Sequence, residues 1–274
     1  MARQFILTEF ESAGISIQGP VREDNQDSIL LPNSTAPSPG GALYAVADGM
    51  GGYANGALAS SLALQHLLKI VRVSDLTTPP TKVLKQAADI ANFEVYKASQ
   101  QIDGTRMGTT LTAAFVIGKL LYLLHVGDSR VYLIRHERIT CLTNDHTVVG
   151  DMVRAHILSA EHIRTHAQRS VLTRAVGLGP FLQAELSQTE LQIGDRIILC
   201  SDGVWSVIED QEFVELSDQA GTVEVLAKNI IDLAVKRETD DNCSAITIQI
   251  RGFRYQTYEE EPRKAGSWLN LFRR

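Results

Sequence analysis

The sequence predicts a mixed α+β fold in which two mostly antiparallel groups of strands pack as a sandwich. Three observations lead to this prediction. Apolar runs of strand length, separated by turn residues, occupy residues 11–47 and 109–142. Two longer stretches with apolar residues at helical spacing lie between these groups, over residues 55–71 and 79–101. A third helical stretch, residues 222–237, precedes the last strand-like run.

The strand predictions rest on short apolar runs bounded by turn residues. In the first group AGISIQG, DSILL and ALYAVA are strand-like, and the Pro-, Ser- and Gly-rich residues 32–41 are typical of a surface loop. In the second group Gly118 and Lys119 suit a hairpin turn between two apolar runs. Strands return in DRIILCSDGVW and SAITIQI. The prolines at the start of 79–101 favour a helix that begins there.

Two segments fall outside this pattern. Residues 145–169 are polar and histidine-rich, and we expect an insertion with short helices that lies over the rest of the domain. From residue 251 onward the sequence is charged, contains Pro and Gly, and loses periodicity. We therefore expect one domain over residues 1–250 and a flexible extension over residues 251–274. The apolar end of this extension, SWLNLFRR, is too short to anchor the chain to a membrane alone.

Composition narrows the class of protein. With 44% hydrophobic and 21% charged residues and a formal net charge of -6, the chain is typical of a soluble globular protein. The acidic balance argues against nucleic-acid binding, which requires a basic face. The sequence shows no secretory signal and no transmembrane segment. Cys141, Cys200 and Cys243 are odd in number and far apart, which favours reduced thiols in a cytoplasmic protein.

Aspartates stand at the ends of several predicted strands. Asp48 follows YAVA, Asp128 follows LLHVG and Asp202 follows IILCS, each beside a glycine. Asp241 stands just before the final strand, and Asp27 opens an early one. A single aspartate of this kind is more often a turn residue. Five at the ends of different strands predict a cleft in which the carboxylates meet.

Carboxylates that meet repel one another, so several stay ionised together only where cations neutralise them. Oxygen ligands select hard ions such as Mg²⁺ or Mn²⁺, and the sequence has no Cys–His cluster of the zinc type. Two hard cations about 3.5–4 Å apart form the usual site for attack on a phosphoester. A glycine beside a ligand also lets a backbone carbonyl join the coordination sphere. The strand ends therefore predict a two-metal hydrolytic site.

The glycines that follow Asp48 allow a different interpretation, a dinucleotide-binding oxidoreductase. GMGGYA fits the G-x-G-x-x-A pattern of a dinucleotide-binding turn, and Asp75 follows at a tolerable distance. However, Asp48 would place negative charge where a pyrophosphate needs the helix N-terminus. The chain also lacks the strand–helix alternation of a doubly wound sheet.

A family resemblance rests on seven motifs that occur in order: VREDNQD, VADGMGG, MGTT, HVGDSR, LTNDH, LCSDGVW and DNCSAI. They resemble the PP2C-type (PPM family) metal-dependent serine/threonine protein phosphatases of bacteria, over about residues 11–250. The resemblance implies a four-layer α-β-β-α sandwich, two mostly antiparallel sheets flanked by helix pairs, with the metal site at one end. Residues 145–169 resemble the flap beside the active site, which gates access and shapes specificity.

The resemblance also implies a role for each aspartate. Asp48 resembles the carboxylate that bridges two metal ions, with the Gly49 carbonyl on one of them. Asp202 and Asp241 resemble the carboxylates that hold the other ion, and Asp27 corresponds to an acid that acts through metal-bound water. The implied cofactors are two Mn²⁺ or Mg²⁺ ions. Asp48, Asp202 and Asp241 are the expected catalytic centre.

Two more residues complete the implied site. Asp128 resembles the ligand of a third, weaker metal ion that it shares with Asp202. Arg22 matches the arginine that holds the substrate phosphate, a task that suits a guanidinium because it pairs bidentately with oxygens and stays charged. The implied mechanism is in-line attack by a water that bridges the two cations, without a phosphoenzyme.

Some positions depart from the family or allow two readings. Met50 stands where many animal members have a histidine, and a metal-bound water is our hypothesis for the leaving-group acid. Tyr53 stands where bacterial relatives frequently have a histidine. His146 is either functional or a loop-capping residue, and we favour the second. The other histidines of the segment read as a solvated helical face: His156, His162 and His166.

The resemblance implies a cytoplasmic, monomeric enzyme that hydrolyses phosphoserine and phosphothreonine in proteins. Its substrates would be phosphoproteins, with a bacterial Ser/Thr kinase or its targets among them. A catalytically inactive binding module on the same fold is the second hypothesis. It is disfavoured because all five aspartates and Arg22 are present, and repelling carboxylates have no use without ions.

Overall fold

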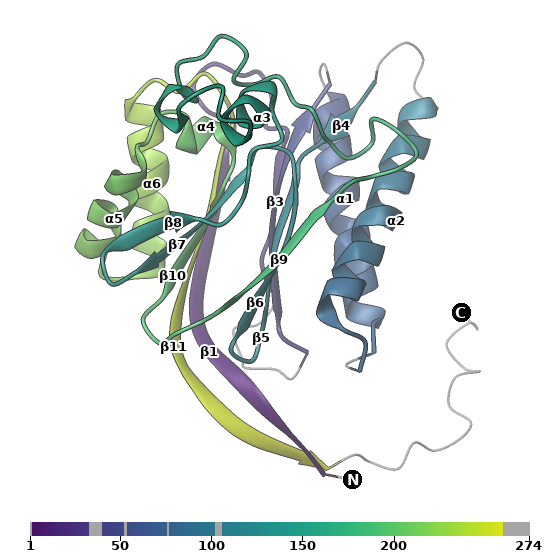
Figure 1. Ribbon diagram of the computed structural model, residues 1–274, viewed down its shortest axis with the longest axis vertical. Coiled ribbons are helices and arrows are strands. Elements are labelled where there is room, and N and C mark those ends of the chain that lie inside the picture. Colours follow the sequence, from purple (N-terminus) through teal and green to yellow (C-terminus); the bar gives the residue numbers. More distant parts are fainter. Residues whose placement is uncertain (1, 33–39, 52–53, 76, 102–105, 260–274) are drawn as a thin grey trace.

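The computed structural model describes residues 2–32, 40–51, 54–75, 77–101 and 106–259. Figure 1 shows two sheets packed face to face with helices on both outer sides, which makes four layers. Every pair of neighbouring strands in these ranges is antiparallel. The predicted fold class is confirmed.

The first sheet contains five strands in the spatial order β1-β11-β10-β7-β8. The first and last strands of the chain are neighbours, with Ile17 opposite Cys243 and Ala2 opposite Glu259. Taken in spatial order, the strands are Ala2–Ile17, Cys243–Glu259, Arg196–Cys200, Arg130–Arg135 and Arg138–Cys141.

The second sheet follows the order β2-β3-β5-β6-β9, and the short β4 (Gly108–Thr109) pairs with β3. The hairpin between β5 and β6 turns at Gly118, whose φ of 55° favours glycine, and the predicted turn is confirmed. Taken in spatial order, the five strands are Asp27–Leu30, Ala42–Met50, Leu111–Ile117, Leu120–Val126 and Glu185–Glu190.

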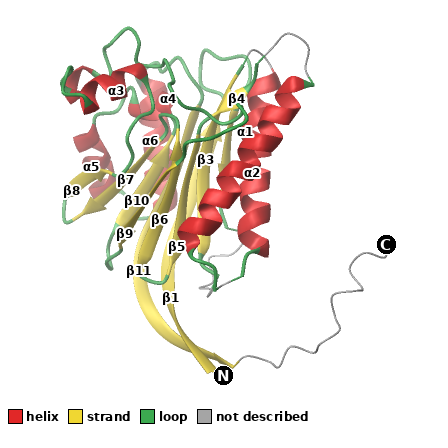
Figure 2. Ribbon diagram, turned by 45° about the vertical axis from the view of Figure 1, so that its right-hand side comes forward, coloured by secondary structure: helices red, strands yellow, loops and turns green. Residues whose placement is uncertain are grey.

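Helices cover the outer face of each sheet (Figure 2). Helices α1 (Ala54–Val73) and α2 (Pro80–Gln100) cover the second sheet. Helices α5 (Asp210–Gln219) and α6 (Val223–Lys236), with the short α4 (Asp202–Trp205), cover the first. None of the helices within the described ranges combines the length and the apolar character that a membrane crossing requires.

Alternation along the strands explains how one sequence fills three apolar layers. In β3, Leu43, Ala45 and Ala47 pack toward α1 and α2. The residues between them, including Tyr44 and Val46, pack toward the other sheet. Because successive side chains of a strand point to opposite faces, a strand buried on both faces reads as a continuous apolar run. This is the pattern that ALYAVA shows.

The antiparallel order excludes the dinucleotide-binding interpretation of GMGGYA. Strand β3, which carries Asp48 and Gly49, is antiparallel to both of its neighbours, β2 and β5. A doubly wound sheet needs parallel neighbours at this point. That interpretation was wrong because the motif describes only a strand, a turn and a helix, and this fold uses the same succession in another sheet.

The segment between β8 and β9 contains α3 (Val148–Arg154) and a short 3-10 helix, Ala160–His162. It lies at the end of the molecule where α4 begins (Figure 1). The expectation of short helices over residues 145–169 agrees with this structure. Asp145, His146 and Thr147 are buried, as are Val149 and Gly150 in α3, so the exposed part of the segment starts only at Arg154.

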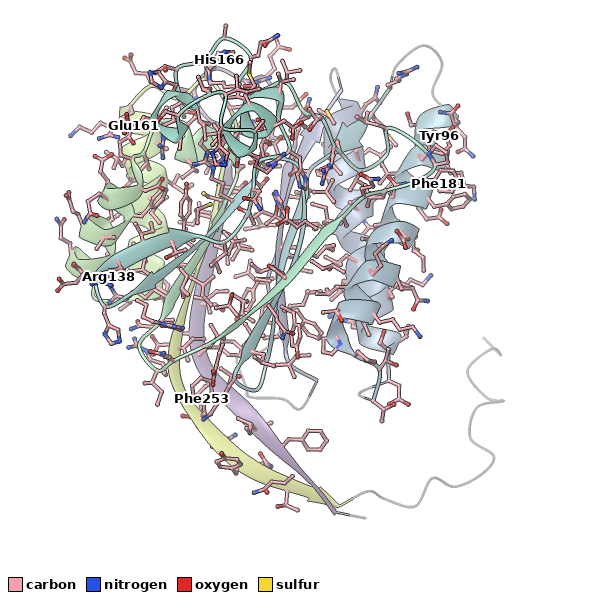
Figure 3. The ribbon with its side chains drawn as sticks, viewed as in Figure 1. Tyr96, Arg138, Glu161, His166, Phe181 and Phe253 are labelled. Carbon is pink, nitrogen blue, oxygen red and sulfur yellow. The ribbon has the colours of Figure 1, made fainter. Side chains whose placement is uncertain are left out.

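The last strand extends beyond the expected domain end at residue 250. Strand β11 continues to Glu259, because residues 252–259 pair with residues 2–9 of β1. Strand β10 ends its pairing at Gln249, so this part is a ribbon of two strands. Leu7, Thr8 and Gly252 are buried, but the other residues of this ribbon whose side chains the structure describes are half-buried or exposed (Figure 3), and its sequence therefore lacks a clear alternation. The rest of the predicted extension, residues 260–274, lies outside the described residues.

Candidate active site

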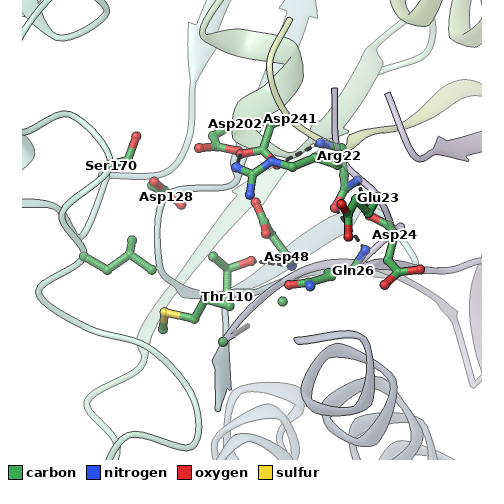
Figure 4. A pocket seen from close by; sticks show the side chains of 15 residues that line it. Arg22, Glu23, Asp24, Gln26, Asp48, Thr110, Asp128, Ser170, Asp202 and Asp241 are labelled. Carbon is green, nitrogen blue, oxygen red and sulfur yellow. Dashed lines mark hydrogen bonds and ion pairs between the residues drawn. The ribbon is translucent and has the colours of Figure 1, made fainter. Parts of the chain in front are cut away.

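A pocket of about 570 Å³ opens at the end of the sandwich where β3 ends and α4 begins (Figure 4). Acidic residues dominate the charges of its lining, and Arg22 is the single basic residue among the described lining residues. The lining consists of Arg22, Glu23, Asp24, Gln26, Asp48, Gly49, Met50, Gly51, Thr110, Asp128, Ser170, Leu172, Asp202, Asp241 and Asn242.

The structure brings four of the five predicted aspartates into this pocket. Asp48 lies near the end of β3, and Asp128 follows β6. Asp202 opens α4 directly after β10, and Asp241 precedes β11. The fifth, Asp27, does not line the pocket but lies opposite Asp48 in the pairing of β2 with β3. The predicted cleft of converging carboxylates is therefore present.

Asp27 is held by two serines. Its Oδ2 accepts hydrogen bonds from Ser201 Oγ at 2.8 Å and Ser244 Oγ at 2.7 Å. Its Oδ1 is buried and has no partner among the described residues. Burial raises the pKa of Asp27 to about 7, although the two hydroxyl groups oppose the change. Sequence reasoning missed both serines, which adjoin aspartate motifs in CSDG and DNCS.

Asp48 is the most crowded member of the cluster. Its backbone N–H donates to Thr110 Oγ1 at 2.9 Å, and its carbonyl accepts from the Thr110 N–H at 2.8 Å. These bonds fix the end of β3 against the MGTT segment. Burial, followed by the charges of Asp27 and Asp202, raises the pKa of the Asp48 carboxyl well above its ordinary value.

Burial and neighbouring charges also raise the pKa values of Asp202 and Asp128. Burial and then the charge of Asp241 raise the pKa of Asp202 to about 6, and its buried Oδ1 has no partner among the described residues. Burial and then the charge of Asp202 raise the pKa of Asp128 well above its ordinary value. Trp205 Nε1 donates to the Asp128 carbonyl at 2.8 Å, which fixes the loop after β6. Neighbouring charges therefore add to the effect of burial at both residues, although a hydrogen bond with Asp48 lowers the pKa of Asp202.

Gly49 is required by close packing. A Cβ at this position would lie 2.1 Å from the Gly56 carbonyl oxygen and 2.7 Å from that of Gln26. Its N–H donates to the Gln26 carbonyl at 3.2 Å. The end of β3, the residue before Asp27 and the first turn of α1 therefore meet at a point that only glycine fits. Close packing therefore explains why a glycine follows Asp48.

Arg22 extends from the segment before β2 to the other side of the pocket. Its Nη2 donates to Asp241 Oδ2 at 2.6 Å and its Nε to the Asp240 carbonyl at 3.0 Å. The Arg22 side chain is 52% exposed, so the guanidinium faces the opening of the pocket. The predicted phosphate-binding arginine and the predicted carboxylates are brought together.

Asn242 is the residue that sequence reasoning missed most clearly. This buried side chain donates from Nδ2 to the carbonyls of Gln18 at 2.6 Å and Asp24 at 2.9 Å. Its Oδ1 accepts from the Gln26 N–H at 3.0 Å. It therefore clamps the segment that carries Arg22. The motif DNCSAI contained the signal, since an amide with both donors and an acceptor suits this clamp.

The donor set fits hard divalent cations. The pocket offers carboxylate oxygens, and two buried carboxylate oxygens, one on Asp27 and one on Asp202, have no partner among the described residues. Unpaired buried acceptors of this kind are rare and call for a cation or a donor. In the described ranges no group of three Asp, Glu, His or Cys residues already forms a coordination shell.

Of the remaining candidate residues that the structure describes, Met50 alone lines the pocket. Met50 offers no donor or acceptor able to replace a histidine. His146 is buried, and its Nδ1 accepts a hydrogen bond from the Gly127 N–H at 3.1 Å. Its ring packs against that of His125, with the ring centroids 4.7 Å apart, which agrees with a loop-capping role. Tyr53 lies outside the described residues. The pocket lining includes none of the three cysteines and none of the three candidate histidines His156, His162 and His166.

Comparison with known proteins places this pocket in a family. The family model described as "Protein phosphatase 2C" matches residues 13–243. The serine/threonine protein phosphatase PstP of Mycobacterium tuberculosis is 34% identical over 258 residues. That match covers 93% of this chain and 47% of PstP, so the chain spans about half the length of this relative. The serine/threonine phosphatase stp of Listeria innocua is 28% identical, over 85% of this chain and 92% of its own length.

Solved structures agree with the observed fold. A crystal structure of PstP/Ppp from Mycobacterium tuberculosis has a TM-score of 0.79 and 32% identity, and the match covers 89% of this chain and 99% of that one. A structure of the PstP catalytic domain in complex with two manganese ions has a TM-score of 0.77 and 30% identity. That match covers 90% of this chain and the whole of the other.

Proposed function

The chain belongs to the protein phosphatase 2C family, and on this premise we propose that it is a metal-dependent phosphatase for phosphoserine and phosphothreonine in proteins. The observation that carries the proposal is the pocket in which four aspartates converge beside an exposed arginine, with an unpartnered buried carboxylate oxygen on Asp202. Such a pocket suits a substrate that is a phosphate dianion, once cations offset the carboxylates.

The carboxylates would hold two Mn²⁺ or Mg²⁺ ions. We assign Asp48 to both ions, the Gly49 carbonyl to one of them, and Asp202 and Asp241 to the other. Asp27, held behind the pocket by Ser201 and Ser244, would act through an intervening water. Asp128, whose pKa the charge of Asp202 raises, would hold a third, weaker ion together with Asp202. The manganese complex of the related PstP domain supports this choice of metal.

When bound, such ions neutralise charge on the phosphoryl group and lower the pKa of water enough to supply a nucleophile at neutral pH. The residues of the chain position the substrate. Arg22 would receive the phosphate oxygens with its guanidinium, which Asp241 and the Asp240 carbonyl orient from behind. Asn242 holds the segment around Arg22 in place through its hydrogen bonds to the carbonyls of Gln18 and Asp24.

A direct attack by water, without a phosphoenzyme, agrees with the lining of the pocket. None of the three cysteines lines it, and burial raises the pKa of Cys243 to about 12, which keeps this thiol protonated. The lining does contain Ser170, which is exposed and has no base among its described hydrogen-bond partners. A serine without a base is a poor nucleophile.

The names of the bacterial relatives support a role in signalling through protein phosphorylation. We propose that the enzyme opposes a Ser/Thr kinase, with that kinase or its targets as substrates, and that it acts as a monomer in the cytoplasm. The inactive binding module is the weaker alternative, since the carboxylates and Arg22 converge in one pocket.

Hydrolysis of p-nitrophenyl phosphate and of a phosphothreonine peptide, with and without Mn²⁺, tests the proposal. We expect Mn²⁺-dependent turnover, and a loss of at least about 100-fold in Asp202→Ala, because the variant lacks part of the charge stabilisation that the ions provide. Asp218→Ala, an exposed aspartate on α5, is the matched control and should keep full activity. A folded wild-type protein without Mn²⁺-dependent turnover would refute the phosphatase.

A further inference from the structure

Glu23 and Asp24 line the pocket but have no role in the site described above. Both residues are exposed and directly follow Arg22. Neither carboxylate has an ion-pair or hydrogen-bond partner among the described residues. We propose that these two carboxylates form a subsite for basic side chains of the substrate, so that the enzyme prefers phosphopeptides with Arg or Lys near the phosphoresidue. This inference rests on the proposed function.

The fold fixes the backbone of the segment that carries the two carboxylates. Asn242 binds the carbonyl of Asp24 itself, and the carbonyl of Gln18 and the N–H of Gln26 at either end of the segment. Gln18 Nε2 also donates to the Arg22 carbonyl at 2.5 Å. A clamped segment loses little conformational entropy when a ligand binds, so its charges are available as a preformed subsite.

The charges of the pocket lead to the same conclusion. Four of its acids, those assigned to the metal ions, are offset when divalent cations bind, and Arg22 faces the phosphate dianion. The carboxylates of Glu23 and Asp24 then remain as uncompensated negative charge at the rim. A peptide with acidic flanks meets like charges there, whereas a basic peptide finds partners, and specificity arises from both effects.

The distances limit the subsite to residues near the phosphoresidue. The Cα atoms of Glu23 and Asp24 lie about 3.8 Å and at most about 7.6 Å from that of Arg22 along the chain. A peptide in extended conformation advances about 3.3 Å per residue, so basic side chains one to three positions from the phosphoresidue are in reach.

The subsite lies on one wall of the pocket. In Figure 4 Glu23 and Asp24 lie on the side of Arg22, and Ser170 lies on the opposite side. Ser170 and Leu172, which line the pocket as well, carry no charge. The preference for basic residues should therefore be stronger on one flank of the phosphoresidue than on the other.

The test uses the full chain with Mn²⁺ and phosphothreonine peptides that carry two Arg, two Ala or two Glu residues on either flank. On the responsive flank we expect kcat/KM for the Arg peptide to exceed that for the Glu peptide by about 3- to 30-fold at low salt, as a few exposed ion pairs allow. Raising the salt to about 0.5 M should shrink this ratio, because exposed charges are screened.

Charge reversal at the rim gives the decisive comparison. Glu23→Lys/Asp24→Lys should reverse the preference toward the Glu peptide, which a merely structural role would not do. Glu215→Lys/Asp218→Lys on α5 makes the same change of net charge away from the pocket and should keep the wild-type preference.

Each outcome separates the two proposals. Equal kcat/KM for all peptides, or equal effects on both flanks, would overturn the subsite and leave the phosphatase intact. A ratio that the rim variant does not change would overturn it as well. If the wild type hydrolyses neither the peptides nor p-nitrophenyl phosphate with Mn²⁺, the proposed function fails, and the subsite fails with it.

Discussion

Replacement of Asp202 by asparagine should make the metal-free protein more stable while it removes the response to metal. Burial and the Asp241 charge raise the pKa of Asp202 from 3.8 to about 6. The folded state therefore binds more protons than the unfolded state between these values. The metal-free wild type should lose stability as the pH rises from about 4 to 6. Above that range the ionised Asp202 lowers the free energy of unfolding by about 3 kcal/mol, relative to a carboxyl group of ordinary pKa.

Asparagine has nearly the same shape and cannot ionise, so Asp202→Asn removes this cost. Oδ1 of Asp202 has no partner among the described residues, and the replacement of this oxygen therefore breaks no described hydrogen bond. At about pH 7.5 without metal we expect the variant to be more stable by 1–3 kcal/mol, or about 3–9 °C in melting temperature for a domain of this size. The lower end allows for relaxation around a coupled cluster.

Thermal melts in EDTA and in Mn²⁺, at about pH 5 and pH 7.5, measure both effects. Mn²⁺ should raise the melting temperature of the wild type at the higher pH and affect Asp202→Asn much less. Asp218→Asn, on the surface of α5, should resemble the wild type in all four conditions. A metal-free Asp202→Asn that is no more stable than the wild type at the higher pH would refute the reasoning about repelling carboxylates.

Four other predictions concern the remaining parts of the structure. Arg22→Lys should lower kcat/KM for phosphopeptides about 10-fold or more with little change in the Mn²⁺-induced melting shift, because lysine lacks the bidentate fork; an unchanged kcat/KM would contradict the assigned role. Asp145→Asn should cost about 3–5 kcal/mol in urea unfolding, since the buried Arg130 loses the negative charge and one of the two acceptor oxygens that its Nε and Nη2 contact at 2.9 and 2.7 Å. Rapid quench with a labelled substrate should recover no covalent phosphoprotein, and a trapped adduct would overturn direct attack by water. Removal of the exposed residues 156–162 should change preference among phosphoprotein substrates more than turnover of p-nitrophenyl phosphate, and equal losses would show that the segment supports the active site instead.

The fold was predictable from the sequence where burial imposes a period. Strand β3 is buried on both faces, and its continuous apolar run marked it as a core strand. Helix α6 has a buried stripe that includes Leu226, Ile230 and Ala234, and this spacing marked a helix. The end of β11 was missed because residues 252–259 lie in a two-stranded ribbon in which residues 254–257 are exposed, so little burial constrains the choice of residue there.

The site was predictable in part for a similar reason. The acidic residues were recognisable because a carboxylate at the exit of an apolar strand is conspicuous. Their partners were not, since Ser201, Ser244 and Asn242 are ordinary residues whose role depends on contacts between segments more than 170 positions apart. Only the pairing of β1 with β11 brings the segment of residues 18–26 next to Asn242. Sequence spacing carries no information about such a contact.

The position of the carboxylates suggests why metal binding should affect the whole fold rather than one loop. Asp48 ends a strand of the second sheet, whereas Asp202 and Asp241 flank β10 and β11 of the first. The two sheets otherwise meet through an apolar layer, whose contacts are not directional, and through the hydrogen bonds of Asp27 with Ser201 and Ser244. An ion held by Asp48 together with Asp202 would link the sheets directly at their ends. Metal binding to the native state alone then stabilises both sheets together, so global unfolding is a suitable measure of a local site.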